Sequence, residues 1–272
     1  MITLAKKLLL FKNEQAIKVV NGAVEFVSST AMTITPKYTN AGVTLEYSLD
    51  GTSWTNIASG ATTPSANIIY FRGSATGTKN LYTSNATTNA WVFTGSKNLE
   101  CNGKLDRLLQ DALGDDNDIL TIGNYCFAYM FYNITTLIKA PELPAITLAT
   151  YCYQSMFQGC TSLTTTPQLP ATTLAEWCYY SMFNGCTGLK LLPALPATIL
   201  ASGCYYSMFR GCTGLKLSTT MIETYDTAYR IPIAGTGTVS TYSLADMFTN
   251  TGGTFTGTPT INTTYYTENT PV

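Results

Sequence analysis

The sequence predicts an α+β protein with more than one domain, in which an all-β, sandwich-like N-terminal domain precedes a short α/β solenoid. Two observations lead to this class. The second half of the chain repeats itself every 26 residues, which is typical of stacked repeat proteins. The first half contains short runs in which apolar and polar residues alternate, as they do in half-buried strands. At 272 residues the chain is long enough to bury a sizeable core.

The N-terminal strands are indicated by alternation and by one turn signal. Val43, Leu45 and Tyr47 alternate with polar residues, and the Asp50-Gly51 pair that follows is typical of a tight turn. Further alternating runs occur around 68–71 and 91–93. These runs predict a small all-β domain.

Six columns of residues recur at the 26-residue period, and a degenerate last unit is expected around Met247 and Phe248. One unit cannot bury its own apolar residues, so the units must stack to form a core. The recurring residues are Cys126, Cys152, Cys178 and Cys204; Met130-Phe131, Met156-Phe157, Met182-Phe183 and Met208-Phe209; Leu137, Leu163, Leu189 and Leu215; Pro141, Pro167 and Pro193; Pro144, Pro170 and Pro196; and Leu148, Leu174 and Leu200.

Each unit is predicted to hold one helix of about ten residues followed by one short strand. Cys178 and Met182 lie four residues apart, Thr173 and Glu176 fit a capping box, and Gly185 follows where a helix end favours positive φ. A short extended segment, closed by P-x-L-P, comes next. The residues equivalent to Gly185 are Asn133, Gly159 and Gly211.

These signals divide the chain into five parts. They are an N-terminal arm, 1–19; an all-β domain, 20–100; a linker and N-terminal cap of the solenoid, 101–125; the repeats, 126–217; and a diverged capping repeat with a polar, extended tail, 218–272.

Composition narrows the classes of function. Charged residues make up only 11% of the chain and the net charge is −1, so no cluster of Lys and Arg favours nucleic-acid binding. No apolar run approaches the roughly 20 residues of a membrane span, and membrane insertion is not expected. The apolar run at residues 8–11 is too short for a secretory signal peptide, and Lys12 follows it directly. We therefore expect synthesis and folding in the cytoplasm.

Neither a metal site nor an enzyme is indicated. The paired cysteines of each unit are spaced C-x7-C and the chain has no histidine, which argues against zinc and against Ser-His or Cys-His catalysis. Buried free thiols are favoured, and disulfides between neighbouring units remain an alternative. Asp115, Asp116 and Asp118 lack the spacing of a calcium loop and are expected to lie in a solvated loop or cap. No cofactor is expected.

The repeat C-Y-x-S-M-F-x-G-C-T-x-L-x-x-x-P-x-L-P resembles the BspA-type leucine-rich repeat, a family of curved solenoids on bacterial surface proteins. The whole layout is similar to phage and prophage virion proteins of gut bacteria, in which a β-domain with a YS-x-DG-x-x-W segment, here Tyr47 to Trp54, precedes such units. The likeness covers roughly residues 40–215. The first unit departs from it with YNITTL, and the fourth lacks P-x-L-P.

The resemblance implies a non-enzymatic virion structural protein of the fibre or head-decoration type, localised to the virion. Its partners would be other virion proteins, bound through the arm or the β-domain, and a host glycan or surface protein. A homotrimer is in keeping with such fibres, although no heptad enforces it. The alternative is a bacterial cell-surface adhesin or interaction protein of the BspA type.

Aromatic residues beside the cysteine column are the candidate partner-binding residues. Those that point outward would form an aromatic ladder able to contact sugars or proteins, and the alternative for each is core packing. The candidates are Tyr153, Trp177, Tyr179, Tyr180, Tyr205 and Tyr206.

Overall fold

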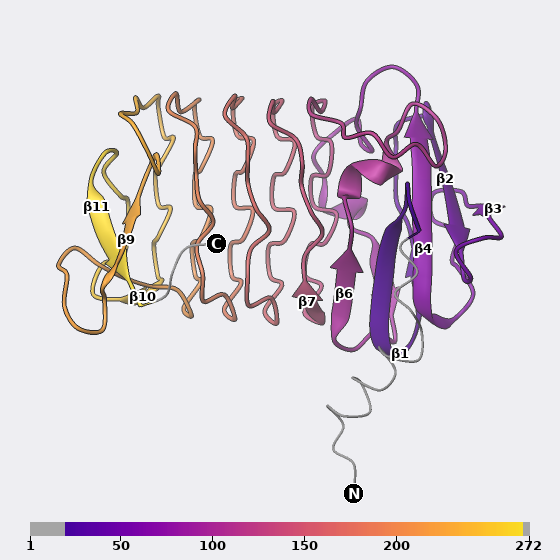
Figure 1. Ribbon diagram of the computed structural model, residues 1–272, viewed down its shortest axis with the longest axis horizontal. Helices are drawn as coiled ribbons and strands as arrows, with labels where there is room; N and C mark the ends of the chain where they lie inside the picture. The colour runs from indigo at the N-terminus through magenta and orange to yellow at the C-terminus, as the bar shows by residue number, and fades with distance from the viewer. Residues whose placement is uncertain (1–19, 269–272) are drawn as a thin grey trace, which may run out of the picture.

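The computed structural model describes residues 20–268 and shows a β-rich chain (Figure 1). The predicted arm, residues 1–19, and the last four residues of the predicted tail lie outside the described residues. Within residues 20–268 no helix has the length and apolar character needed to cross a membrane. The strands are β1 (Val24–Thr35), β2 (Val43–Ser48), β3 (Thr55–Asn56), β4 (Ala66–Ala75), β5 (Val92–Thr94), β6 (Leu99–Asn102), β7 (Leu137–Lys139), β8 (Lys216–Ser218), β9 (Thr227–Arg230), β10 (Gly252–Gly253) and β11 (Thr264–Thr267).

The first sheet has seven strands in the order β3-β2-β4-β1-β6-β7, and β5 pairs with the second half of β1. The β-rich fold predicted for this part of the chain is confirmed, including strands at the three alternating runs. Phe26, Phe71 and Trp91 form its aromatic core, with the Phe71 and Trp91 ring centroids 5.1 Å apart.

The helix predicted in each repeat is wrong. Within the described residues the only helical segments are two short 3-10 helices, η1 (Thr87–Asn89) and η2 (Leu105–Leu108), and both precede the repeats. The segment around each cysteine is instead a series of turns in which every fourth residue has positive φ. These left-handed residues are Tyr125, Tyr129 and Asn133; Tyr151, Ser155 and Gly159; Trp177, Ser181 and Gly185; Gly203, Ser207 and Gly211; and Tyr242, Asp246 and Asn250. Positive φ was correctly predicted at Asn133, Gly159, Gly185 and Gly211.

Backbone hydrogen bonds alternate along these turns. The Tyr153 N–H donates to the Cys178 carbonyl of the next unit at 2.9 Å, whereas the following N–H, of Gln154, donates back to the Tyr151 carbonyl at 3.2 Å. The same alternation continues through the segment and recurs in each unit. Along these turns, the bonds between units run from N–H groups of one unit to carbonyls of the next. Successive units therefore lie side by side as parallel coils (Figure 1).

We call residues 121–215 together with 238–250 the repeat stack. The coils are also joined on a second side, where parallel bridges link Thr121 to Thr147 and Thr147 to Thr173. This two-sided bonding satisfies backbone groups that would otherwise be buried without partners. Strands were expected in every unit, yet only the first, the fourth and the last carry one after their left-handed Asn or Gly residue, namely β7, β8 and β10.

Side chains at equivalent positions stack on one another through the core. Phenylalanine rings form one column and run nearly parallel, with centroids 5.4 Å apart between Phe131 and Phe157 and between Phe157 and Phe183. A left-handed serine costs roughly 1–2 kcal/mol, whereas burying one Phe or Met side chain contributes about 1.5–3 kcal/mol. Burial of a Met and a Phe in each coil therefore outweighs the local strain. The full column is Phe93, Phe131, Phe157, Phe183, Phe209 and Phe248.

The cysteines lie in the core, as predicted, and all eight are free. The thiol of Cys186 lies 2.9 Å from the Phe157 carbonyl of the preceding coil, and Cys160 and Cys212 make the equivalent contact. Burial raises the pKa of the Cys186 thiol to about 12. These thiols act as small packing groups that also hydrogen-bond between coils.

The first sheet covers the N-terminal end of the repeat stack. The N–H groups of Leu81 and Trp91 donate to the carbonyls of Cys126 and Met130, each at 3.0 Å. Strands β6 and β7 pair in parallel, and the Phe column continues into β5 through Phe93. The sheet and the repeats consequently share one hydrophobic core.

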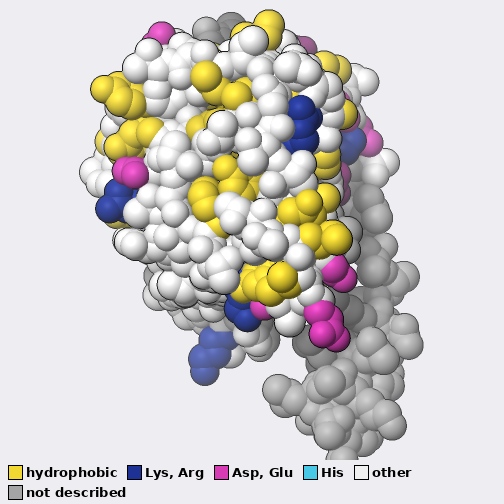
Figure 2. Space-filling view, turned by 90° about the vertical axis from the view of Figure 1, so that its left-hand side faces the viewer, with side chains coloured by type: hydrophobic (Ala, Val, Ile, Leu, Met, Phe, Trp, Pro, Cys, Tyr) yellow, Lys and Arg dark blue, Asp and Glu magenta, His cyan; other side chains and the backbone are white. Residues whose placement is uncertain are grey.

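At the C-terminal end, residues 242–250 bond to 203–211 in the same register as the earlier coils, after a longer connection. A second sheet, in the order β10-β8-β11-β9, lies at this end of the stack (Figure 1). The end face is largely uncharged, and its hydrophobic side chains lie in separate patches (Figure 2).

A buried charge network lies at the junction of the sheet and the stack. The Arg107 side chain is only 5% exposed and contacts Asp106, Asp116 and Asp118 at 2.9–3.4 Å. Lys104 also pairs with Asp118, at 2.7 Å. These hydrogen-bonded partners lower the pKa of Asp118, while burial raises the pKa of Asp106. The acidic segment thus compensates a buried guanidinium.

The left-handed turns can be tested with Ser181→Gly. Ser181 has a φ of 51°, and glycine relieves that strain at the cost of extra chain entropy. We expect the free energy of unfolding, measured with urea, to stay unchanged or rise by up to about 1 kcal/mol. Ser162→Gly is the control, because Ser162 lies outside the left-handed region. This variant should lower the free energy of unfolding by roughly 0.5 kcal/mol. A comparable decrease in the free energy of unfolding for Ser181→Gly would contradict the left-handed conformation assigned to Ser181.

The charge network predicts a pH dependence. Because the folded-state pKa of Asp118 lies below its ordinary value of 3.8, its stabilisation is present above that pH and is lost on further acidification. Asp118→Asn should therefore lower the free energy of unfolding by about 0.5–1 kcal/mol at neutral pH. The difference from the wild type should shrink as the pH falls below 3.8, whereas Asp226→Asn at an exposed position should change little. If the difference in free energy of unfolding between Asp118→Asn and the wild type did not change with pH, the ion pairs of Asp118 would be refuted.

Candidate functional site

A shallow depression of about 560 Å³ lies along the outer side of the repeat stack. We call it the aromatic groove. Its walls combine aromatic rings with two side-chain amides and contain no Lys, Arg, Asp or Glu. The lining residues are Asn85, Tyr151, Gln154, Trp177, Tyr180, Tyr206 and Tyr242.

The structure divides the six candidate aromatic residues into two sets. Trp177, Tyr180 and Tyr206 are partly exposed and meet in the aromatic groove. The expectation of a surface role for the other three does not hold, because they are at most 1% exposed and stack inside the core. These three are Tyr153, Tyr179 and Tyr205.

One wall of the groove is a ladder of parallel rings. Tyr151 stacks on Trp177, with ring centroids 6.4 Å apart and 9° between the ring planes, and on its other side it stacks on Tyr125. The next position in this column is Gly203, where a Cβ would overlap the Trp177 ring. The faces of Tyr151 and Trp177 are therefore covered by neighbouring coils.

The remaining aromatic rings are inclined to one another. Trp177 and Tyr180 meet at 77°, Tyr180 and Tyr206 at 62°, and Tyr206 and Tyr242 at 84°. In an edge-to-face contact the ring that presents its edge keeps both faces free. Tyr242 is also 62% exposed. This side of the groove can present ring faces to a ligand, whereas the ladder presents ring edges.

Amides at the N-terminal end of the groove are held by hydrogen bonds. Asn85 donates to the Gln154 side-chain carbonyl at 2.9 Å, and the Gln154 amide donates to the Tyr129 hydroxyl at 3.0 Å. Gln154 is buried and Asn85 is exposed. Gln154 is thus fixed in orientation, while Asn85 at the rim retains donor and acceptor capacity.

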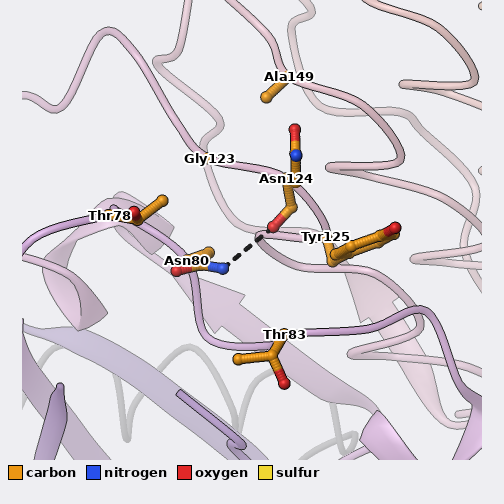
Figure 3. A pocket seen from close by; sticks show the side chains of 7 residues that line it. All are labelled: Thr78, Asn80, Thr83, Gly123, Asn124, Tyr125 and Ala149. Atoms are coloured by element: carbon orange, nitrogen blue, oxygen red, sulfur yellow. Dashed lines mark hydrogen bonds between the residues drawn. The ribbon is translucent and has the colours of Figure 1, made fainter. Parts of the chain in front are cut away.

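A second depression, of about 420 Å³, lies where the first sheet meets the first coil (Figure 3). We call it the junction pocket. Thr78, Asn80 and Thr83 come from the segment after β4, and the Asn80 amide donates to the Asn124 carbonyl at 3.2 Å. Two links join it to the aromatic groove: Tyr125 stacks on Tyr151, and Thr83 is two residues from Asn85. Its lining residues are Thr78, Asn80, Thr83, Gly123, Asn124, Tyr125 and Ala149.

Four residues of the aromatic groove were missed in the sequence. Tyr151 and Tyr242 occupy the column of Trp177, so the repeat register could have revealed Tyr151 directly. Tyr242 follows a longer connection that hides its register. Asn85 comes from outside the repeats, and Gln154 carries no signal of its contact with Asn85, 69 residues away.

The chemistry of both depressions suits recognition of a neutral molecule. The lining groups are phenols, an indole, amides and hydroxyls. The acidic segment is committed elsewhere, since Asp116 and Asp118 pair with Arg107. Among residues 20–268 no group of three or more His, Cys, Asp or Glu side chains is arranged to hold a metal ion.

No protein-family model matches the chain, and searches of curated proteins and of solved structures give no match either.

The packing of Trp177 can be tested with Gly203→Ala. The added methyl group would overlap the indole ring, so we expect a loss of about 1–3 kcal/mol in the free energy of unfolding and a shift in tryptophan emission. Gly77→Ala is a matched control, because Gly77 also has positive φ but open space around it. Identical stability and emission for the two variants would contradict the described contact.

Proposed function

We propose that the protein is a non-enzymatic component of a phage particle, and that it displays an aromatic recognition surface for attachment to the host cell. In this proposal the repeat stack is a short solenoid of the leucine-rich-repeat type. The arm or the first sheet connects it to other virion proteins.

The observation that carries the proposal is the position of the aromatic groove on a rigid support. Its rings come from successive coils that are bonded to one another through backbone and core side chains. A surface built this way needs little ordering when a partner binds, and low ordering costs favour affinity. Aromatic residues are also the side chains most enriched at binding hot spots.

The lining chemistry favours binding over catalysis. The aromatic groove contains no carboxylate, imidazole or thiol that could act as a general acid, general base or nucleophile at neutral pH. The thiols nearest in sequence lie in the core, where burial raises the pKa of Cys178 to about 12. A thiol with such a pKa is not a nucleophile at neutral pH.

Mass spectrometry of density-purified phage particles tests the assignment to the virion. We expect peptides of this protein at a fixed ratio to the major capsid protein, and the ratio distinguishes a decoration protein from a tail fibre. Purified protein should also compete with particles for adsorption to host cells. Detection in the bacterial envelope, with none in purified particles, would instead favour the adhesin alternative.

A further inference from the structure

We propose that the aromatic groove and the junction pocket together bind one neutral oligosaccharide, in two adjoining subsites. This inference rests on the proposed attachment function and specifies the chemical class of the ligand. Four features of the described residues carry it.

The first feature is the combination of rings and amides without charge. The C–H bonds on the face of a sugar ring carry a partial positive charge, and they pack favourably on the negative face of an aromatic ring. Sugar hydroxyls both donate and accept hydrogen bonds, as the amide of Asn85 does. A sulfated, phosphorylated or sialylated ligand would instead require a basic side chain, and neither depression contains one.

The second feature is that the inclined rings are available. Tyr180, Tyr206 and Tyr242 meet at 62° and 84°, so one ring presents its edge in each contact, and Tyr242 is 62% exposed. The Tyr151 and Trp177 ladder beside them is rigid because it is packed between coils. The groove therefore has a fixed wall on one side and ring faces for stacking on the other.

The third feature is the composite rim. The Asn85 amide comes from the segment between β4 and β5, and its hydrogen bond to Gln154 joins that segment to the second coil within the groove. The Gln154 amide is oriented by Tyr129, so these polar groups are fixed before any ligand arrives.

The fourth feature is the shared boundary of the two depressions. Tyr125 lines the junction pocket, Tyr151 lines the aromatic groove, and their rings stack 5.7 Å apart. An oligosaccharide that crosses the stacked rings of Tyr125 and Tyr151 would contact both depressions. Together the two depressions are lined by fourteen residues, whereas a standard protein interface contributes roughly 20–30 residues. The size favours an oligosaccharide over a folded protein.

Binding of the full-length, fluorescently labelled protein to a glycan array tests the inference. The probes are neutral hexasaccharides of defined linkage, their disaccharide fragments, and sialylated and sulfated glycans for comparison. We expect binding to at least one neutral hexasaccharide, at least tenfold weaker binding of its disaccharide, and no preference for charged glycans. Binding confined to charged glycans, or equal binding of both lengths, would overturn the proposal.

Variants locate the site. Tyr180→Ala combined with Tyr206→Ala should weaken hexasaccharide binding at least tenfold, and Asn85→Ala at the exposed rim should weaken it severalfold without affecting folding. Tyr132→Ala combined with Tyr266→Ala is the matched control, because both tyrosines are partly exposed and line neither depression. Unchanged binding in Asn85→Ala and the groove double variant, or equal losses in the control, would refute the site.

The ligand class and the attachment function can fail separately. If particles contain the protein but the protein binds no neutral glycan on the array, the ligand class is wrong and the attachment function is not affected. Cell binding that is abolished by protease treatment of the host would then identify a protein receptor. If the array shows the expected glycan but particles lack the protein, the virion assignment is wrong and the saccharide site stands.

Discussion

The structure depends on hydrogen bonds that run in one direction between neighbouring coils. Every second N–H along the turn segment donates to a carbonyl of the following coil, so these donors are satisfied only when the next coil is in place. Leu81 and Trp91, in the segment between β4 and β5, supply donors for the first coil. At the other end, the Phe248 N–H reaches the Gly257 carbonyl and the Asp246 N–H reaches the Thr258 hydroxyl. Segments on both sides of the repeat stack thereby pair groups of the first and last coils that would otherwise lack partners.

The same constraint produces the candidate site. Because the coils are in register, equivalent side chains lie one above another in rows. Aromatic rows occur both inside the core and at the surface, so they differ in burial and not in the type of residue. The Phe and Tyr rows inside the core fix the spacing of the coils. The outer row of Tyr125, Tyr151 and Trp177 extends the same spacing to the surface, where Gly203 ends it. The aromatic groove is thus a surface consequence of core packing.

The sequence predicted the period, the buried columns and the β-rich first part of the chain, because these depend on which residues are apolar and how often they recur. The helix could not be separated from the turns, because a four-residue turn period also places Cys178 and Met182 on one side of the backbone. Left-handed glycines were predicted, but left-handed Ser155 and Ser181 carry no such signal. Alternation did not single out β1, which becomes the centre of the first sheet.

Of the residues in the candidate site, the repeat predicted Trp177, Tyr180 and Tyr206. Asn85 depends on a tertiary contact that no local pattern encodes.

Scalar couplings across hydrogen bonds, measured by NMR on labelled full-length protein, test the central claim most directly. Couplings are expected from the amide nitrogens of Tyr153 and Phe157 to the carbonyl carbons of Cys178 and Met182, respectively. The Gln154 amide between them should couple to the Tyr151 carbonyl instead. Couplings from each amide to the carbonyl four residues earlier would mean that the repeats are helical, and would contradict the account of both the stack and its aromatic surface.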